Sequence, residues 1–144
     1  MSVDGRVWPE ADPGAAGLHA RWYSANLAAG TCTAQRCAAC RRFQHPARYR
    51  CTHCRSAMLR FESIDVRATM HEVSVTHRPF HPAFADVVPY ATAVVRSADG
   101  PRMWLVVRCD PADVTSGSPV TIGLDRFGVP HAVLDRPGIQ RLRR

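Results

Sequence analysis

Two pairs of cysteines have the residue type and the spacing of a metal site. Cys37 and Cys40 form one Cys-x-x-Cys pair, and Cys51 and Cys54 form a second pair after ten intervening residues. Each pair predicts a tight turn, or knuckle, that aims two sulfurs at one point, so that four thiolates surround a tetrahedral Zn²⁺. Because this sphere leaves no open position for water or substrate, we expect a structural zinc ribbon rather than a catalytic centre.

Two other uses of these cysteines fit the sequence less well. A disulfide framework is typical of short secreted chains, but residues 1–17 lack the basic start and apolar segment of a signal peptide. A thioredoxin-like redox site would need one Cys-x-x-Cys motif beside a βαβ pattern, not two in tandem. His45 and His53 lie nearby and could replace a sulfur, although a cysteine already stands at every knuckle position.

Composition sets the size and class of the protein. The 144 residues, 46% of them hydrophobic, are enough for one domain with a real core, or for one module with a small appendage. No apolar run approaches the ~18 residues that span a bilayer. With six cysteines and no recognisable leader signal, we expect a protein of the reducing cytoplasm.

The charge of the chain indicates an anionic partner. The net charge is +7, and all 19 basic residues are arginine. A GC-rich coding bias is the simpler explanation for the absence of lysine, yet guanidinium groups still bind phosphates and carboxylates through forked contacts and stack on flat rings. The charge therefore fits nucleic acid or the phosphates of a nucleotide-like cofactor and does not distinguish between them.

The elements that must position the cysteines follow from the hydrophobic pattern. Residues 18–29 have apolar positions at helical spacing, with Trp22, Tyr23 and Leu27 on the apolar face, and Gly30 follows where a helix would stop. This predicts a short amphipathic helix directly before the knuckles. Its apolar face packs either on its own domain or on another protein.

A β-rich segment follows the ribbon. Residues 59–75 show partial alternation and many β-branched residues, which predicts one long strand that bends around a small barrel. Asp99-Gly100 is the strongest hairpin signal of the chain. Four further strands are expected, over residues 89–96, 102–109, 120–124 and 129–134. Five strands without room for crossover helices favour a Greek-key barrel of the OB type.

The predicted fold is therefore mainly β, with an N-terminal helix, a small zinc ribbon and a five-stranded OB-fold barrel. In the leader, Pro9 and Pro13 favour a loose chain, in which Trp8 is either an anchor or exposed. The expected segments are a flexible leader (1–17), an amphipathic helix (18–31), a zinc ribbon (32–58), an OB-fold barrel (59–135) and a basic tail (136–144).

The loop from His77 to Phe84 is the most distinctive part of the predicted barrel. Two prolines stiffen it, and it carries two aromatic rings, two imidazoles and a guanidinium. Exposing aromatic rings to water is unfavourable, so such a surface favours a binding site for a ligand or a partner. Alternatively, the loop folds back over the mouth of the barrel with Phe80 and Phe84 as plugs.

The sequence contains no convincing catalytic constellation. It lacks a Gly-x-Ser-x-Gly elbow, a phosphate-binding glycine loop and a His-Glu-x-x-His motif. Cys32 or Cys109 could act as a nucleophile beside His77 or His81, but a buried free cysteine is the commoner case.

Several motifs together resemble one known family. In chain order they are Trp22-Tyr23, Gln35 to Cys40, Phe43 to Pro46, Cys51 to Cys54, Thr76 to Phe84, and Val88 to Tyr90. Over about residues 20–135 the chain resembles the zinc-ribbon plus OB-fold proteins that were long known as a domain of unknown function and are now described as acyl-CoA-associated. Members are typically non-catalytic partners of thiolase-like enzymes, including lipid-transfer-type thiolases and aldolases, or of MaoC-like hydratases.

This resemblance implies roles for particular residues. Structural zinc would be held by Cys37, Cys40, Cys51 and Cys54. The acyl-CoA, or the partner, would lie near Arg78, Phe80, His81 and Phe84. The N-terminal helix and the ribbon would dock on the partner, and the barrel would lie near the CoA chain.

The chain departs from the family pattern in two places. Arg41 and Arg55 follow the knuckles where the family usually has glycine, which costs roughly 1 kcal/mol if a left-handed backbone is needed there. Val66 and Ala68 stand where the first barrel strand usually has glycines. The first departure concerns metal affinity and the second concerns a local bulge, and neither removes a ligand.

The leading hypothesis is a cytoplasmic, non-catalytic accessory subunit with structural zinc. It would bind acyl-CoA peripherally and assemble with a thiolase-like or MaoC-like hydratase enzyme. The alternatives are a single-stranded nucleic-acid-binding zinc-ribbon/OB module and a cysteine-dependent enzyme that uses Cys109 or Cys32. Against nucleic acid, the barrel strands show no obvious series of exposed aromatics alternating with arginines.

Overall fold

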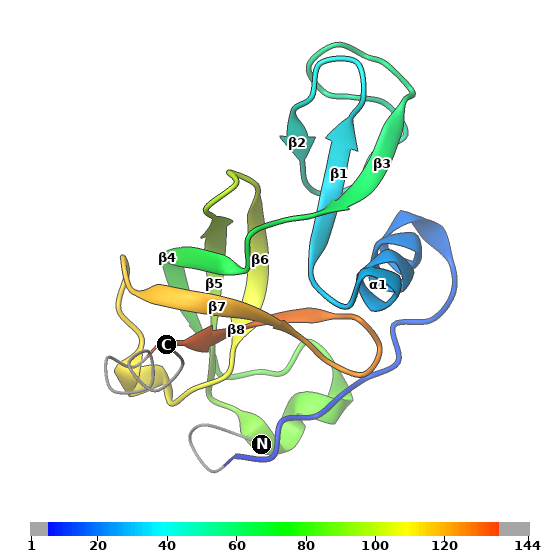
Figure 1. Cartoon of the computed structure of the whole chain (residues 1–144). Coiled ribbons are helices and arrows are strands. Elements are labelled where there is room, and N and C mark those ends of the chain that lie inside the picture. Colours follow the sequence, from blue (N-terminus) through cyan, green and yellow to red (C-terminus); the bar gives the residue numbers. More distant parts are fainter. Residues whose placement is uncertain (1–5, 136–144) are drawn as a thin grey trace.

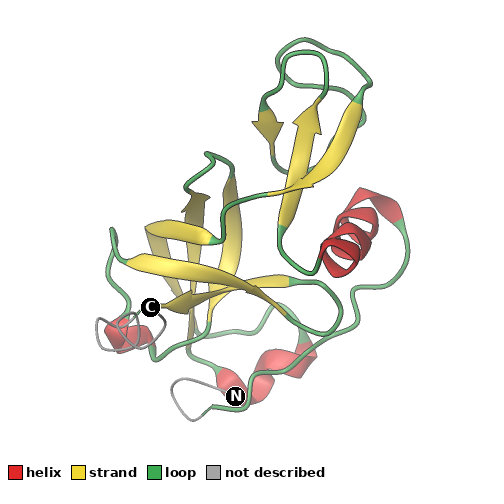
Figure 2. Ribbon diagram, viewed as in Figure 1, coloured by secondary structure: helices red, strands yellow, loops and turns green. Residues whose placement is uncertain are grey.

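The computed structural model describes residues 6–135 and contains a small three-stranded sheet, a five-stranded barrel and an α-helix (Figures 1 and 2). Residues 1–5 and 136–144, the latter being the predicted basic tail, lie outside the described part of the chain. Figure 1 shows the small sheet above the barrel and the helix beside their junction. This architecture confirms the predicted fold class. Among the described residues, no helix is long and apolar enough to cross a membrane.

The small sheet forms the ribbon. β1 (Thr33–Cys37) lies between β2 (Phe43–Gln44) and β3 (Leu59–Ser63), and both pairings are antiparallel. The last residue of β1, Cys37, is paired with Leu59 of β3. The first knuckle therefore starts from a paired strand rather than from a free loop.

Residues 59–75 form two strands, so the prediction of one long bent strand is wrong. β3 belongs to the ribbon sheet, whereas β4 (Arg67–Thr76) is the first strand of the barrel. Between them the Ile64 amide donates to the Cys32 carbonyl oxygen at 3.1 Å, which fixes the place where the chain passes from one sheet to the other. β-branched residues favour a strand both before and after this break, so the sequence pattern does not mark it. The hydrogen bond at the break joins residues that are 32 positions apart in sequence.

The barrel closes in the order β4-β5-β6-β8-β7. Neighbouring strands are antiparallel except β6 and β8, which are parallel. β4 bends at a register shift between Met70 and Val73, and the bulge forms although residues 70–73 include no glycine. The remaining strands are β5 (Tyr90–Ser97), β6 (Arg102–Val107), β7 (Pro119–Leu124) and β8 (Pro130–Leu134). The core includes the buried side chains of Met70, Val95, Met103, Val107 and Val120.

Helix α1 (Gly17–Ala29) ends where the sequence predicts. Gly30 has a φ of 71°, and its amide donates to the carbonyl oxygens of Asn26 (2.9 Å) and Leu27 (3.2 Å). Trp22 is buried, as expected of the apolar face, but Leu27 is 51% exposed, so that face is predicted wrongly at Leu27. The neighbouring polar residue Asn26 is fully buried instead. Its burial is possible because its side chain has hydrogen-bond partners on two other parts of the structure.

Asn26 joins the helix, the ribbon and the barrel. Its Oδ1 accepts from the amide (2.7 Å) and the hydroxyl (2.8 Å) of Thr33 in β1, and its Nδ2 donates to the Gly128 carbonyl oxygen (2.9 Å) between β7 and β8. Trp22 Nε1 also donates to the Thr33 carbonyl oxygen at 2.6 Å. Gly128 has a φ of 84°, and a Cβ there would overlap the Tyr23 carbonyl oxygen, so the helix is seated directly on this turn.

The described part of the leader is anchored on the barrel. Trp8 is buried and packs edge-on against Tyr90, with 6.5 Å between ring centroids, and Val87 belongs to the same cluster. Arg6 donates to the carbonyl oxygens of Val87 (3.1 Å) and Pro89 (2.9 Å). Of the two alternatives for Trp8, the structure therefore supports the anchor.

Asn26→Ala is expected to lower the free energy of unfolding by about 2–4 kcal/mol, because the Thr33 amide and the Gly128 carbonyl oxygen would remain buried without a partner. Urea denaturation of the zinc-loaded protein, followed by circular dichroism, measures the change. Ser24→Ala, at an exposed position of the same helix, is the control and should shift stability by less than about 0.5 kcal/mol. Equal stability of the two variants would contradict the role of Asn26 as a joint.

Candidate metal centre

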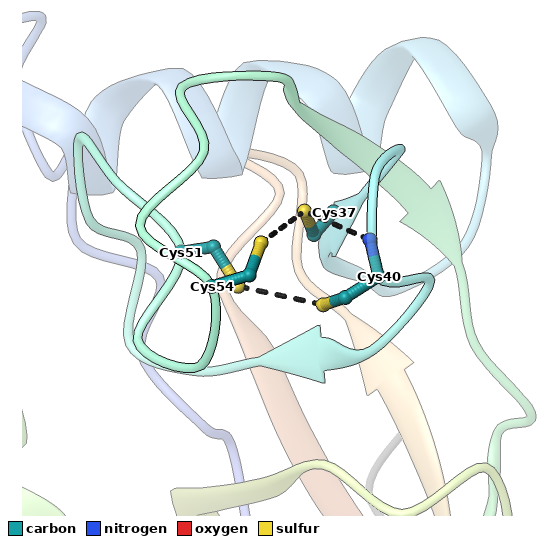
Figure 3. A group of neighbouring side chains, drawn as sticks. All are labelled: Cys37, Cys40, Cys51 and Cys54. Carbon is teal, nitrogen blue, oxygen red and sulfur yellow. Dashed lines mark hydrogen bonds between the residues drawn. The ribbon is translucent and has the colours of Figure 1, made fainter.

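The four predicted ligands converge on one point (Figure 3). The sulfurs of Cys37 and Cys54 are 3.5 Å apart, those of Cys40 and Cys51 are 3.6 Å apart, and all four lie within 4.8 Å of one another. A tetrahedral Zn²⁺ with Zn–S bonds of about 2.3 Å requires sulfurs about 3.8 Å apart. The residues present therefore fit zinc, and the four of them close its coordination sphere.

Both knuckles have the same backbone geometry. The Arg41 amide donates to the Cys37 carbonyl oxygen (2.8 Å), and the Arg55 amide donates to the Cys51 carbonyl oxygen (2.9 Å). Arg41 and Arg55 have φ values of 66° and 63°, in the left-handed region that favours glycine. The two arginines therefore adopt a backbone conformation that glycine would adopt without strain.

Amide groups around the sulfurs favour ionised thiols. The Cys40 amide donates to the Cys37 sulfur (3.5 Å), and this hydrogen bond is the main reason that the pKa of Cys37 is lowered to about 6. The amides of Cys54 and His53 lower the pKa of Cys51 in the same way. These N–H groups stabilise the charge that a zinc ligand must carry.

The fourth sulfur shows why the cluster needs a cation. The Ser56 amide lowers the pKa of Cys54. Hydrogen bonding with the Cys37 sulfur, desolvation, and the sulfurs of Cys51 and Cys40 outweigh it and raise the pKa to about 11. Four adjacent thiolates repel one another, so complete ionisation of the cluster requires a divalent ion at its centre.

Two buried glutamines hold the loop that carries the second knuckle. Gln35 Oε1 accepts from the Arg48 amide and from Gln44 Nε2, both at 2.8 Å, and Gln35 Nε2 donates to the Arg48 carbonyl oxygen at 2.8 Å. Gln44 Oε1 accepts from the Thr52 amide at 2.8 Å. Since Thr52 lies within the second knuckle, this pair of side-chain amides fixes that knuckle relative to β1.

The two nearby histidines are outside the sulfur cluster. The His45 ring packs on Trp22, with 4.6 Å between ring centroids, and so connects the ribbon to α1. Desolvation, with smaller contributions from His19 and Arg48, lowers the pKa of His45 to about 4, so this ring is neutral at pH 7. His53 is exposed.

Two of the residues expected to lie near acyl-CoA are open to solvent. Arg78 is exposed, and Phe80 is 82% exposed. An apolar ring with this exposure at the tip of a loop is available to a ligand or to a partner. Phe80 therefore does not plug the barrel.

The other two residues stabilise the loop itself. His81 Nδ1 accepts from the Ala83 amide (3.0 Å) and caps the 3-10 helix η1 (Pro82–Val87). The Phe84 ring is half-buried, 5.4 Å from the Tyr90 ring, in the cluster that also holds Trp8. Phe84 thus resembles the plug of the alternative interpretation, whereas Arg78 and Phe80 face solvent.

The two cysteines outside the cluster are core residues. Cys32 and Cys109 are both buried. Burial raises the pKa of Cys32 to about 12, and its sulfur lies 3.7 Å from Met103 Sδ. These environments do not provide an accessible thiolate nucleophile.

The sequence patterns did not identify the buried amides of Asn26, Gln35 and Gln44. One signal was available: Asn26 stands four residues after Trp22, on the helix face that should be apolar. Gln35 likewise shares the buried face of β1 with Thr33. A polar residue on a face that the periodicity assigns to the core must have partners.

Freshly prepared, reduced protein is expected to contain one zinc ion per chain, as measured by elemental analysis. Cys51→Ser should lose it, because three thiolates no longer close the sphere. Structural zinc of this kind contributes roughly 10–16 kcal/mol to the folding of small modules, so a chelator should unfold the ribbon, with loss of its dispersed amide NMR signals. Cys109→Ala, outside the cluster, should keep the metal. A chain that is metal-free and fully folded would contradict this site.

Arg41→Gly and Arg55→Gly are each expected to stabilise the zinc-loaded protein by about 0.5–1 kcal/mol, since glycine adopts a positive φ without a Cβ clash. Thermal unfolding and competition with a zinc chelator measure the gain. Arg41→Ala removes the same guanidinium but keeps the Cβ, and should give no gain. Equal effects of Gly and Ala would assign the change to the lost side chain instead of the backbone.

Two family models match the chain. The model described as ChsH2, rubredoxin-like zinc ribbon domain, matches residues 30–60, and the model described as ChsH2, C-terminal OB-fold domain, matches residues 63–125. The boundary between the two matches falls at the end of β3, where the ribbon sheet gives way to the barrel.

Solved structures and a curated relative are similar to the chain. A structure described as an Ltp2-ChsH2(DUF35) aldolase has a TM-score of 0.69 and 27% identity, covering 84% of this chain and 95% of that chain. A DUF35-family protein of unknown function from Sulfolobus solfataricus has a TM-score of 0.53 at 15% identity, over 80% of this chain and 83% of that chain, and shows likeness of fold alone. A probable enoyl-CoA hydratase alpha subunit from Thermomonospora curvata is 34% identical over 91 residues, which are 61% of this chain and 27% of the relative.

The chain thus spans about a quarter of that curated relative's length but nearly the whole of the aldolase-associated chain. The two matched domains stand in the same order as the two modules of the structure and meet where the sheets meet. This chain belongs to the DUF35 family, with a ChsH2-type zinc ribbon followed by a ChsH2-type OB-fold domain.

Proposed function

We propose that the chain is a non-catalytic accessory subunit that assembles with a thiolase-like enzyme or a MaoC-like hydratase in acyl-CoA metabolism. The observation that carries this proposal is the likeness, over 84% of the chain, to a chain of the Ltp2-ChsH2(DUF35) aldolase. The match to a probable enoyl-CoA hydratase alpha subunit supports the same area of metabolism.

The chemistry of the described residues supports a non-catalytic role. The four-sulfur cluster has no position for a substrate or an activated water once zinc is bound. The two remaining thiols, Cys32 and Cys109, are buried in the core. In this proposal the reaction takes place on the companion enzyme, and the zinc ribbon keeps a docking surface rigid.

Exposed apolar side chains support assembly with a partner. Tyr49 and Met58 lie exposed on the ribbon, and Phe80 is exposed on the barrel loop. Aromatic residues and methionine are enriched at protein interfaces. We therefore propose that the ribbon docks on the companion enzyme and that the loop around Phe80 lies near its acyl-CoA.

In this proposal the loop from His77 to Phe84 contributes to the acyl-CoA site. Arg78 and Phe80 are exposed and can meet a ligand as a cation and an apolar ring. His81 and Phe84 act through the conformation of the loop, by capping η1 and by packing on Tyr90.

The tagged chain, isolated from its own host, is expected to elute in a hetero-oligomer with a thiolase-like or hydratase enzyme identified by mass spectrometry. The complex should turn over acyl-CoA substrates, whereas the isolated chain should not. Cys51→Ser should lose the companion because the ribbon unfolds, and Cys109→Ala should retain it. Robust turnover by the isolated chain, or elution of the chain alone from host extract, would overturn the proposal.

A further inference from the structure

A basic cleft lies between the two modules. It has a volume of about 390 Å³ and separates residues 43–53 of the ribbon from the hairpin that joins β5 and β6. Figure 1 shows this hairpin on the ribbon side of the barrel. Arg48 lines the cleft from the ribbon, and Arg96 and Arg102 line it from the barrel. No aspartate or glutamate among residues 6–135 lines it.

The two barrel arginines stand directly opposite each other. Arg96 of β5 pairs with Arg102 of β6, so both side chains leave the same face of the barrel. Neither has an ion pair within residues 6–135. Like charges at opposed positions destabilise a sheet, and Arg48 adds a third positive charge across the cleft. A bound anion would remove this repulsion.

An exposed indole lies beside the arginines. Trp104 is two residues after Arg102 on β6 and therefore on the same face, about 7 Å along the strand. It is 66% exposed and stands opposite Val94 of β5. An indole this open to solvent on a strand, next to two unpaired guanidinium groups, is a stacking surface beside a charge site.

A ligand that carries both a phosphate and a flat ring could bind the arginines and Trp104 at the same time. Guanidinium forks match the oxygens of phosphate, and the face of an indole stacks with a nucleobase. The volume of the cleft lies within the range of about 300–1,000 Å³ found for small-molecule sites. A nucleic-acid strand uses a series of stacking platforms, whereas Trp104 is the only large aromatic this exposed on the described barrel strands. An acidic peptide would leave the indole unused.

We propose that this cleft and the adjoining outer face of β6 bind the nucleotide end of a CoA thioester, with Arg96 and Arg102 on its phosphates and Trp104, which lies outside the cleft, against its adenine. The choice of CoA among nucleotides rests on the proposed function. Arg96 lies six positions along β5 from Tyr90, about 20 Å of strand, and Tyr90 lies beside the loop from His77 to Phe84. The cleft and the loop would therefore serve opposite ends of one extended ligand.

Isothermal titration of the full, zinc-loaded chain with CoA, dephospho-CoA and pantetheine tests the site. Affinity should fall in that order, with no measurable binding of pantetheine, and higher salt should weaken CoA binding. Arg96→Gln/Arg102→Gln should weaken CoA binding by about tenfold or more, because two charge-assisted hydrogen-bonding groups are lost. Trp104→Leu should weaken CoA and dephospho-CoA alike, because both carry the adenine.

Control variants separate this cleft from other surfaces. Arg60→Gln, an exposed arginine on β3, should leave CoA binding unchanged. Unchanged affinity in the double variant would overturn the proposal. So would a short single-stranded oligonucleotide that binds through Arg96 and Arg102 and is not displaced by CoA. Loss of the companion enzyme with intact CoA binding would refute the proposed assembly and leave this site standing.

Discussion

Repulsion among four sulfurs is the constraint on which the ribbon depends. The thiols lie within 4.8 Å of one another, and amides lower the pKa of two of them, while hydrogen bonding with the Cys37 sulfur, desolvation and the other sulfurs raise the pKa of Cys54. A divalent cation stabilises the fully ionised cluster, because it turns the repulsion between thiolates into attraction to the ion. The sheet built on it has one strand of two residues and two of five, so we expect folding of the ribbon to depend on metal binding. Because four cysteines would fill the coordination sphere, a bound metal ion would have no open position for substrate or water.

Buried side-chain amides give the small modules a defined arrangement. Asn26 uses both lone pairs of its oxygen on Thr33 and one N–H on Gly128, and thereby fixes α1 and β1 on the barrel. Gln35 and Gln44 do the same for the loop before the second knuckle. Apolar contacts alone would permit sliding between such small surfaces, whereas a buried amide tolerates one geometry because an unmade hydrogen bond is costly there.

The sequence predicted what local spacing determines. The knuckles, the end of α1 at Gly30 and the hairpin at Asp99-Gly100 each depend on a few neighbouring residues, and each is present. The division of residues 59–75 into β3 and β4 was missed because it depends on a hydrogen bond from Ile64 to the distant Cys32. A local sequence pattern cannot predict a hydrogen bond to a residue that is distant in the sequence.

The same limit explains why the basic cleft was not found in the sequence. Arg102 and Trp104 alternate on one strand, but their meaning depends on Arg96 across the hairpin and on Arg48 across the gap between the modules. The register of the β5–β6 hairpin places Arg96 opposite Arg102. The packing of the ribbon against the barrel adds the charge of Arg48. The three guanidinium groups make the cleft cationic. Among residues 6–135, Arg48, Arg96 and Arg102 have no acidic partner in an ion pair. An anion bound in the cleft therefore explains the three charges better than a solvated surface does.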